Sequence, residues 1–292
     1  MNKVWSLTVR NLKHYYRDKG AFFFSFLSVF IVVGLYIVFL SDMQIRNIES
    51  VAGNTAEARF VIYTWMIGGL LCIPAVSVPM IILTFKVEDA AEVRQNDFLI
   101  TPVKRTSLML GYVLAACLAG ICLTVLVFLL GELFVSFVGG PVLSLAAHWK
   151  LLGLIVLLNI SFAGFSFFVT FRLKTNAALT IVNTLLNTLI GFFAGLYFPL
   201  GYLSEEIAVI IKVFPLSHAA ALFRQIFMED ALNLAFRNTS PSIIEDIRQS
   251  YGLDLVIGGH SLSFLELLVS LIAFGLLFYS YSVIILKRCK SK

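Results

Sequence analysis

Six long apolar runs dominate the sequence and limit how the chain can fold. They cover residues 21–40, 60–85, 106–138, 151–171, 177–197 and 262–286. A helix needs about 20 apolar residues to cross the hydrocarbon core of a bilayer. Lipid offers no partner to a backbone N–H or C=O group, so each run has to bond its own backbone as a helix. The sequence therefore predicts an all-α polytopic membrane protein with six transmembrane helices. Residues 41–58, which are polar, are predicted to form a loop between the first two.

The composition supports a single membrane domain over residues 1–292. Hydrophobic residues make up 59% of the chain and charged residues 13%, whereas soluble domains carry about 25% charged residues. The net charge of +5 comes from short basic clusters beside the apolar runs. This placement favours topology signals at a membrane over a nucleic-acid surface, and no nucleic-acid partner is expected.

The first segment, residues 1–20, has the pattern of an amphipathic helix. Over residues 3–17, apolar and basic side chains recur on opposite faces. The apolar face holds Trp5, Val9, Leu12 and Tyr16, and the basic face holds Lys3, Arg10, His14 and Arg17, with Lys13 at its margin. Such a helix is typical of a membrane surface. The alternative is a flanking segment that only sets the topology.

Residues 86–105 form a charged segment between the second and third apolar runs. The segment carries Glu88, Asp89, Glu92, Arg94 and Asp97, followed by Thr101–Pro102 and Lys104–Arg105. With six spans and both termini on the inner side, fifteen of the 22 basic residues fall in inner segments. Because cytoplasmic loops are enriched in Lys and Arg, we expect this segment and both termini in the cytoplasm. A soluble partner is expected to bind it.

The fifth apolar run contains a polar stripe. Its members recur every three to four residues and are Thr180, Asn183, Thr184, Asn187 and Thr188. This spacing places them on one face of a helix. An amide group in a bilayer needs a hydrogen-bonding partner, so we expect the stripe to face another helix or water.

The stretch between the fifth and sixth runs is broken and then becomes polar. Pro199, Gly201 and Pro215 interrupt residues 194–227. Too few apolar residues lie between the prolines to span a bilayer, which predicts a re-entrant or interfacial helix pair. Residues 228–261 are of mixed polarity and are expected to form a small extracellular insertion.

The sequence carries little sign of catalysis. It contains no Gly-Lys-Ser/Thr phosphate loop, no metal-ligand spacing and no His-Glu-x-x-His element. We therefore expect no metal and no cofactor bound by this chain. Glu132 and Glu266 are the acidic residues inside the apolar runs, both toward the outer ends. They either line an outer vestibule or reach headgroup water and a nearby basic residue.

The order of these elements resembles the permease subunits of ABC type-2 exporters. The shared elements are an amphipathic elbow helix, two spans, and a cytoplasmic loop that ends in a Thr-Pro-x-x-Arg-like element. That element reads Thr101, Pro102, Val103, Lys104 and Arg105 here, and the segment after the fifth span supplies Gly195, Phe198, Pro199, Pro215, Leu216 and Arg224. The insertion at 228–261 departs from the simple pattern.

The resemblance implies partners and roles. Such permeases form a homodimer, or pair with a related permease, and recruit ATP-binding-cassette subunits that hold ATP and Mg. The resemblance assigns coupling to Glu88, Asp89, Glu92, Arg94 and Phe98, and a second contact to Arg10, Lys13 and Arg17. It assigns a pathway between the protomers to spans two and five, for which our candidates are Trp65, Gly69, Cys72, Asn183, Asn187 and Phe192. Plain helix packing is the alternative for each pathway residue.

The function implied is that of a non-catalytic exporter subunit. It would move a hydrophobic or amphipathic substrate, such as a drug, an antimicrobial peptide or a lipid, out across the cytoplasmic membrane. ATP hydrolysis on the separate subunit would drive this efflux. Two alternatives stay open: a non-transporting anchor or sensor subunit of an ABC complex, and a membrane enzyme that acts on lipid.

Overall fold

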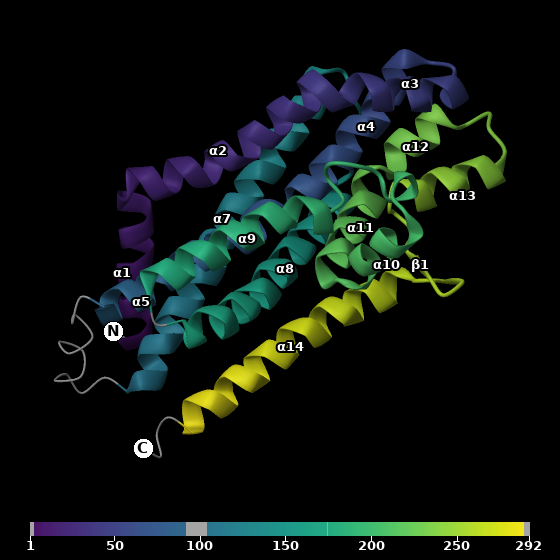
Figure 1. Cartoon of the computed structure of the whole chain (residues 1–292). Coiled ribbons are helices and arrows are strands. Elements are labelled where there is room, and N and C mark those ends of the chain that lie inside the picture. The colour runs from purple at the N-terminus through teal and green to yellow at the C-terminus, as the bar shows by residue number, and fades with distance from the viewer. Residues whose placement is uncertain (1–2, 92–103, 174, 289–292) are drawn as a thin grey trace.

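The chain folds into long helices with a small two-stranded hairpin near the end of the sequence (Figure 1). The computed structural model describes residues 3–91, 104–173 and 175–288. The helices are α1 (Lys3–Arg17), α2 (Lys19–Leu35), α3 (Ser41–Ala52), α4 (Thr55–Leu70), α5 (Cys72–Ala91), α7 (Arg105–Phe137), α8 (Leu145–Arg172), α9 (Asn176–Phe193), α10 (Glu205–Val213), α11 (Pro215–Phe227), α12 (Glu229–Ala235), α13 (Pro241–Ser250) and α14 (Phe264–Arg288). The short elements are a π-helical turn (Tyr36–Leu40), a 3-10 turn (Leu200–Tyr202), β1 (Val256–Ile257) and β2 (His260–Ser261), and the two strands pair antiparallel.

Within these described ranges, six helical stretches are long and apolar enough to cross a membrane. They are Phe22–Ala52, Thr55–Asp89, Thr106–Phe137, Leu145–Arg172, Asn176–Phe193 and Phe264–Ile284. The predicted all-α polytopic fold is therefore confirmed. The predicted helix pair before the last span is also present, because α10 and α11 meet at an angle of 86°. Pro215 begins α11, where its missing N–H leaves no hydrogen bond unmade.

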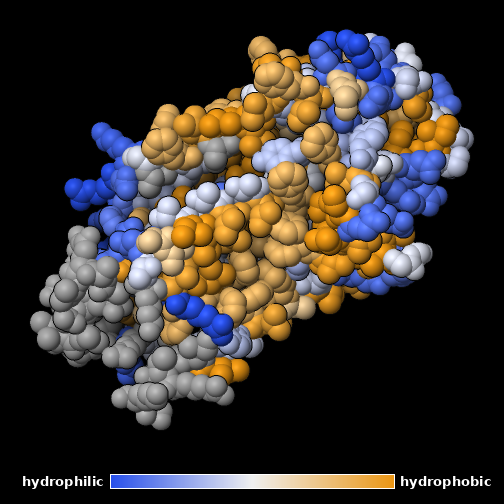
Figure 2. Space-filling model, viewed as in Figure 1, coloured by the Kyte–Doolittle hydropathy of each residue, from blue (hydrophilic) through white to orange (hydrophobic). Residues whose placement is uncertain are grey.

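The two ends of the helix bundle differ in composition. Helix α1 and the last turns of α14 lie at one end, which we call the termini end, and α3, α12 and α13 lie at the other, the α13 end (Figure 1). An apolar surface covers the long helices between them, and hydrophilic residues gather at the α13 end (Figure 2). This banding is what a bilayer requires of a protein that spans it.

The segment after the first span is helical, where a polar loop was predicted for residues 41–58. The helix passes through the π-helical turn into α3, and it ends at Gly53, whose φ of 72° suits glycine. Asn54 then caps α4 by accepting a hydrogen bond from the N–H of Ala56 (2.9 Å). The helix forms because Ile45 and Ile48 are buried on one face of a largely polar sequence.

The second span is the centre of the bundle. Its most apolar window is 94% buried, against 18% for the first span and 22% for the last. It consists of α4 and α5, which meet at Leu71, and α5 packs against α7, α8 and α9. Every other part of the fold is therefore positioned relative to α4 and α5.

The polar segment 228–261 packs onto the bundle. Met228, Leu232, Tyr251 and Leu253 are buried in the same hydrophobic cluster as α4 and α11. A second cluster fills the termini end, between α1, α5, α7 and α8. Each end of the molecule thus has its own packed core, and the α5 helix contributes to both.

We predict that two glycines with different surroundings respond in opposite ways to alanine. A Cβ at Gly111 of α7 would lie 2.6 Å from Cβ of Leu7 in α1, whereas a Cβ at the exposed Gly153 would meet nothing within 4 Å. Gly111→Ala should destabilise the protein by about 1–3 kcal/mol through overpacking. Gly153→Ala should stabilise it by about 0.5–1 kcal/mol through helix propensity.

Thermal unfolding of the two purified variants in one detergent checks this pair. Equal shifts of the midpoint in the same direction would show that α1 does not pack on α7 as described.

Candidate functional site

A partly buried ion pair joins three helices at the termini end. Arg10 of α1 donates to both carboxylate oxygens of Asp89 in α5, at 2.8 and 3.1 Å. The hydroxyl of Tyr112 in α7 donates to the same carboxylate. The Asp89 side chain is 3% exposed and that of Arg10 is 34% exposed. A two-pronged Arg–carboxylate bond fixes direction as well as distance, so this cluster locks α1 across the end of α5.

The same contacts keep Arg10 charged and place the Asp89 carboxylate inside this chain. The hydrogen bond from Arg10 to Asp89 raises the pKa of the guanidinium. Asp89 was predicted to contact a soluble partner, but its carboxylate is buried and bonded within this chain. Lys13 and Arg17 lie exposed on α1, and Glu88 is partly buried. Glu92, Arg94 and Phe98 lie outside the described residues, as does Thr101–Pro102.

A fully buried cation lies near the α13 end. Arg224 of α11 is 2% exposed. Its Nη2 donates to the carbonyl oxygens of Ala194 (2.8 Å) and Gly195 (2.9 Å), directly after the last residue of α9. Its guanidinium carbon lies 4.7 Å from the ring centre of Trp65 in α4. The carboxyl end of a helix carries partial negative charge, so carbonyls and an aromatic face stabilise this cation.

Trp65 extends this cluster toward the polar segments. Its Nε1 donates to the carbonyl of Tyr251 (2.7 Å), and the Tyr251 hydroxyl donates to Oε1 of Gln44 in α3 (2.9 Å). Burial raises the pKa of Tyr251, so its hydroxyl stays a neutral donor. The Arg224 cluster therefore connects α3, α4, α11, the end of α9 and the turn after α13.

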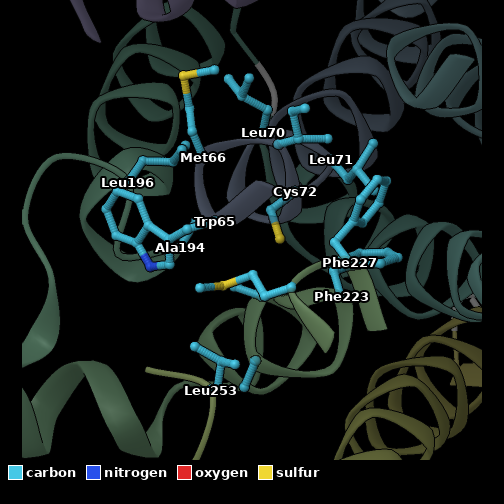
Figure 3. Close-up of a cluster of buried hydrophobic side chains, with 14 of the residues drawn as sticks. Trp65, Met66, Leu70, Leu71, Cys72, Ala194, Leu196, Phe223, Phe227 and Leu253 are labelled. Atoms are coloured by element: carbon cyan, nitrogen blue, oxygen red, sulfur yellow. The ribbon is translucent and has the colours of Figure 1, made fainter. Parts of the chain in front are cut away.

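Three residues predicted to line a pathway lie inside the protomer. Trp65 and Cys72 are fully buried, and Figure 3 shows them between Ala194 and Leu196 on one side and Phe223 and Phe227 on the other. Gly69 is buried as well, and a Cβ there would lie 2.9 Å from Nη2 of Arg224. In this conformation the three line no accessible surface, because they form the pocket that holds Arg224.

The polar stripe of α9, in contrast, lies on the surface. Thr180, Thr184, Asn187 and Thr188 are exposed, and with Asn183 they line a shallow groove of about 530 Å³. The threonines and Asn187 donate back to the carbonyl four residues earlier in α9. Oδ1 of Asn183 has no hydrogen-bond partner among the described residues. A paler row over α9 interrupts the apolar surface in Figure 2. Phe192, at the end of the helix, is 47% exposed.

Glu132 and Glu266, the acidic residues of the six apolar runs, each have a histidine partner. Oε2 of Glu132 in α7 lies 2.8 Å from Nε2 of His148 in α8. Oε1 of Glu266 lies 3.0 Å from Nε2 of His260, and Oε2 accepts from the backbone N–H of Ser263. The structure therefore places them in two separate local pairs, and an outer vestibule between them stays a prediction. Among the described residues no group of three His, Cys, Asp or Glu side chains is arranged to hold a metal.

Neither Arg224 nor Tyr112 was predicted to have a role in a site. Arg224 interrupts the apolar sequence of α11, and a cation in such a helix needs a buried partner, which was the available signal. Tyr112 carries no comparable signal, because a tyrosine in a long apolar helix is ordinary.

The fold and these clusters define a multi-pass helical membrane protein with a polar stripe on the surface of α9, a helix of membrane length. The sequence profile of the ABC-2 type transporter family matches residues 2–228. The chain therefore belongs to the ABC-2 type transporter family, whose membrane component is a permease that is not itself catalytic. A search of the curated proteins finds no match.

We predict that replacing Arg10 and replacing Asp89 lower the stability of the protein by different amounts. Arg10→Gln removes both guanidinium hydrogen bonds from a buried carboxylate, whereas Asp89→Asn leaves a cation that can reach solvent. Each change should lower stability by about 1–3 kcal/mol, with Arg10→Gln the larger. The double variant should lose less stability than the sum of the losses in the two single variants. Thermal unfolding in detergent measures all three, and strict additivity would contradict a direct pair.

For the second cluster, we predict that Arg224→Lys is strongly destabilising although it keeps the charge. Lysine lacks the planar fork that bonds two carbonyls while stacking on Trp65, so we expect a loss of about 1.5–3 kcal/mol. The control is Arg237→Lys, because Arg237 is 62% exposed and pairs with Glu57 at 3.3 Å. That change should cost at most about 1 kcal/mol. Similar unfolding midpoints for both variants would show that these contacts of Arg224 do not stabilise the fold.

Proposed function

We propose that this chain is the membrane-spanning permease of an ABC exporter, and that two permease copies face each other across the polar stripe of α9. The observation that carries the proposal is the polar groove on a helix of membrane length, where Asn187 is exposed and Asn183, partly buried, has an Oδ1 that is unpaired within the described part of the chain. An amide group left without a partner in an apolar medium costs about 1–3 kcal/mol. A second protomer and a water-filled passage between the copies would remove that cost. The second copy is either the same chain or a related permease.

The proposed orientation puts the termini end in the cytoplasm. The segments at this end contain most of the basic residues, among them Lys13 and Arg17 on the exposed face of α1. Such a bias marks the cytoplasmic side of a plasma-membrane protein. An ATPase subunit with its own ATP and Mg would dock here, against α1 and the segment that follows α5. Arg10 and Asp89 then act inside the permease, by holding α1 rigidly on α5.

Rigid attachment matters because the energy of ATP has to reach the passage. A complete switch between two permease conformations, from 1:99 to 99:1, needs about 5.5 kcal/mol of differential binding. A movement of the docked ATPase would pass from α1 through the Arg10–Asp89 pair to α5. Helix α9 packs on α5, so the stripe would move with it.

The chemistry of the stripe suggests the class of substrate. It offers amide and hydroxyl groups without a charge, and the same helix exposes Ile181, Leu185 and Leu189. A mixed surface of this kind suits a hydrophobic or amphipathic molecule, such as a drug, an antimicrobial peptide or a lipid, and efflux of such molecules is the direction that we propose.

We predict that reversing two charges on α1 weakens the ATPase complex. A tagged chain purified from its native membranes should bring down an ATP-binding-cassette subunit in roughly equal amount. The double change Lys13→Glu and Arg17→Glu should lower that amount several-fold, because the complementary charges no longer attract. The matched control is Arg46→Glu with Lys150→Glu, two exposed residues toward the α13 end.

Three results would count against parts of the proposal. If the unaltered chain copurifies with no ATPase, the permease proposal is overturned. Equal recovery with both double variants would reject α1 as the docking site. An ATPase whose turnover never responds to any hydrophobic compound would favour a sensor subunit.

A further inference from the structure

A groove on the outside of the bundle lies between α8 and α14, away from the α9 stripe. It encloses about 770 Å³ and is lined mainly by apolar and aromatic side chains. Leu277 and Ile284 form part of its wall, and they are 63% and 50% exposed. Arg172 is its one charged member.

Arg172 is held in place at the termini end of this groove. It is the last residue of α8, and its guanidinium carbon lies 5.1 Å from the ring centre of Phe168 and 5.2 Å from that of Tyr281. It also donates to the Tyr281 hydroxyl. A guanidinium has five N–H donors in one plane, so this contact leaves donors for a second acceptor. Within the described residues, Arg172 forms no salt bridge with a carboxylate of this chain.

The length of the groove matches one leaflet of a bilayer. Its lining runs from Ala273 to Ile284 along α14. Eleven positions of helix correspond to about 16 Å, which is about half of the hydrocarbon core of roughly 30 Å. The cation therefore lies at one end of an apolar trough that is as deep as a single layer of acyl chains.

We propose that this groove binds one anionic phospholipid from the leaflet at the termini end. Its phosphate accepts hydrogen bonds from Arg172, and an acyl chain lies along Leu277 and Ile284. Arg172 complements the charge of the phosphate, and the apolar trough matches the length of an acyl chain. Arg172 is the one charged residue among the described residues of the lining, and this favours a lipid with net negative charge over a zwitterionic one. An apolar helix of a partner would leave Arg172 without an anion.

Fluorescence quenching by brominated lipids tests this site on the full chain. A tryptophan at Leu277→Trp reports the groove, with the signal of the three native tryptophans subtracted from the parent protein. The protein is reconstituted in bilayers that contain acyl-brominated phosphatidylglycerol or acyl-brominated phosphatidylcholine at the same fraction. Leu110→Trp on α7, 52% exposed, reports the general lipid surface near the same end.

We expect brominated phosphatidylglycerol to quench the tryptophan at position 277 with an apparent affinity about fivefold higher than that of brominated phosphatidylcholine. A factor of about five is what one basic residue at the interface adds to the binding of an anionic lipid. Position 110 should show no such preference. Arg172→Gln should abolish the preference at 277. Tyr281→Phe keeps the charge and the ring but removes the hydroxyl that holds Arg172, and it should reduce the preference in part.

Two results would overturn the site. Equal quenching by both lipids at position 277 would mean that Arg172 selects no anion. If neither lipid quenches the tryptophan at position 277, protein covers the groove. If Arg172→Gln does not fold, an unchanged preference in the Tyr281→Phe variant contradicts the proposed role of Arg172.

Discussion

The buried guanidinium of Arg224 is the constraint on which the α13 end of the protein depends. A cation that is 2% exposed has to find compensation inside the protein. It finds this in the carbonyls after α9 and in the face of Trp65. Glycines at positions 68 and 69 allow α4 to approach closely enough for these contacts, since a Cβ at either would lie 2.9 Å from an atom of the Arg224 side chain. One charged side chain thereby fixes where α9 ends and how α11 turns back into the bundle.

The opposite end repeats the same physical device with a different pairing. There Arg10 meets a carboxylate, Asp89, and Tyr112 completes the cluster. Helix α5 connects the two clusters, because Cys72 at its start is buried beside Arg224 and Asp89 lies near its end. The seventeen positions between these residues correspond to about 26 Å of helix. A continuous helix with a charge cluster at each end is suited to carry a displacement, and α9 packs on it.

The sequence was sufficient for properties that are local, and insufficient for those that depend on distant contacts. Span positions follow from run length and hydropathy, and the α9 stripe follows from helical spacing alone. Residues 41–58 read as a loop because Gln44 and Asn47 are polar, yet Gln44 is buried against Tyr251, more than two hundred positions away. The same limit explains why the sequence alone did not show that Trp65 and Asp89 are internal. Their residue types suggest a pathway or a partner surface, and only the packing of α3, α11 and α1 around them shows that they are internal.

The central claim is that the α9 stripe borders water inside the membrane, and thiol accessibility measures this most directly. With the four native cysteines replaced, Asn187→Cys and Leu185→Cys are reconstituted with the ATPase and exposed to a charged, membrane-impermeant thiol reagent. Leu185 is the matched control, since it is 57% exposed and only two positions away on the same helix. The account predicts rapid modification at 187, a change of that rate when ATP is added, and little modification at 185. Protection of both positions, or equal reaction at both, would contradict it.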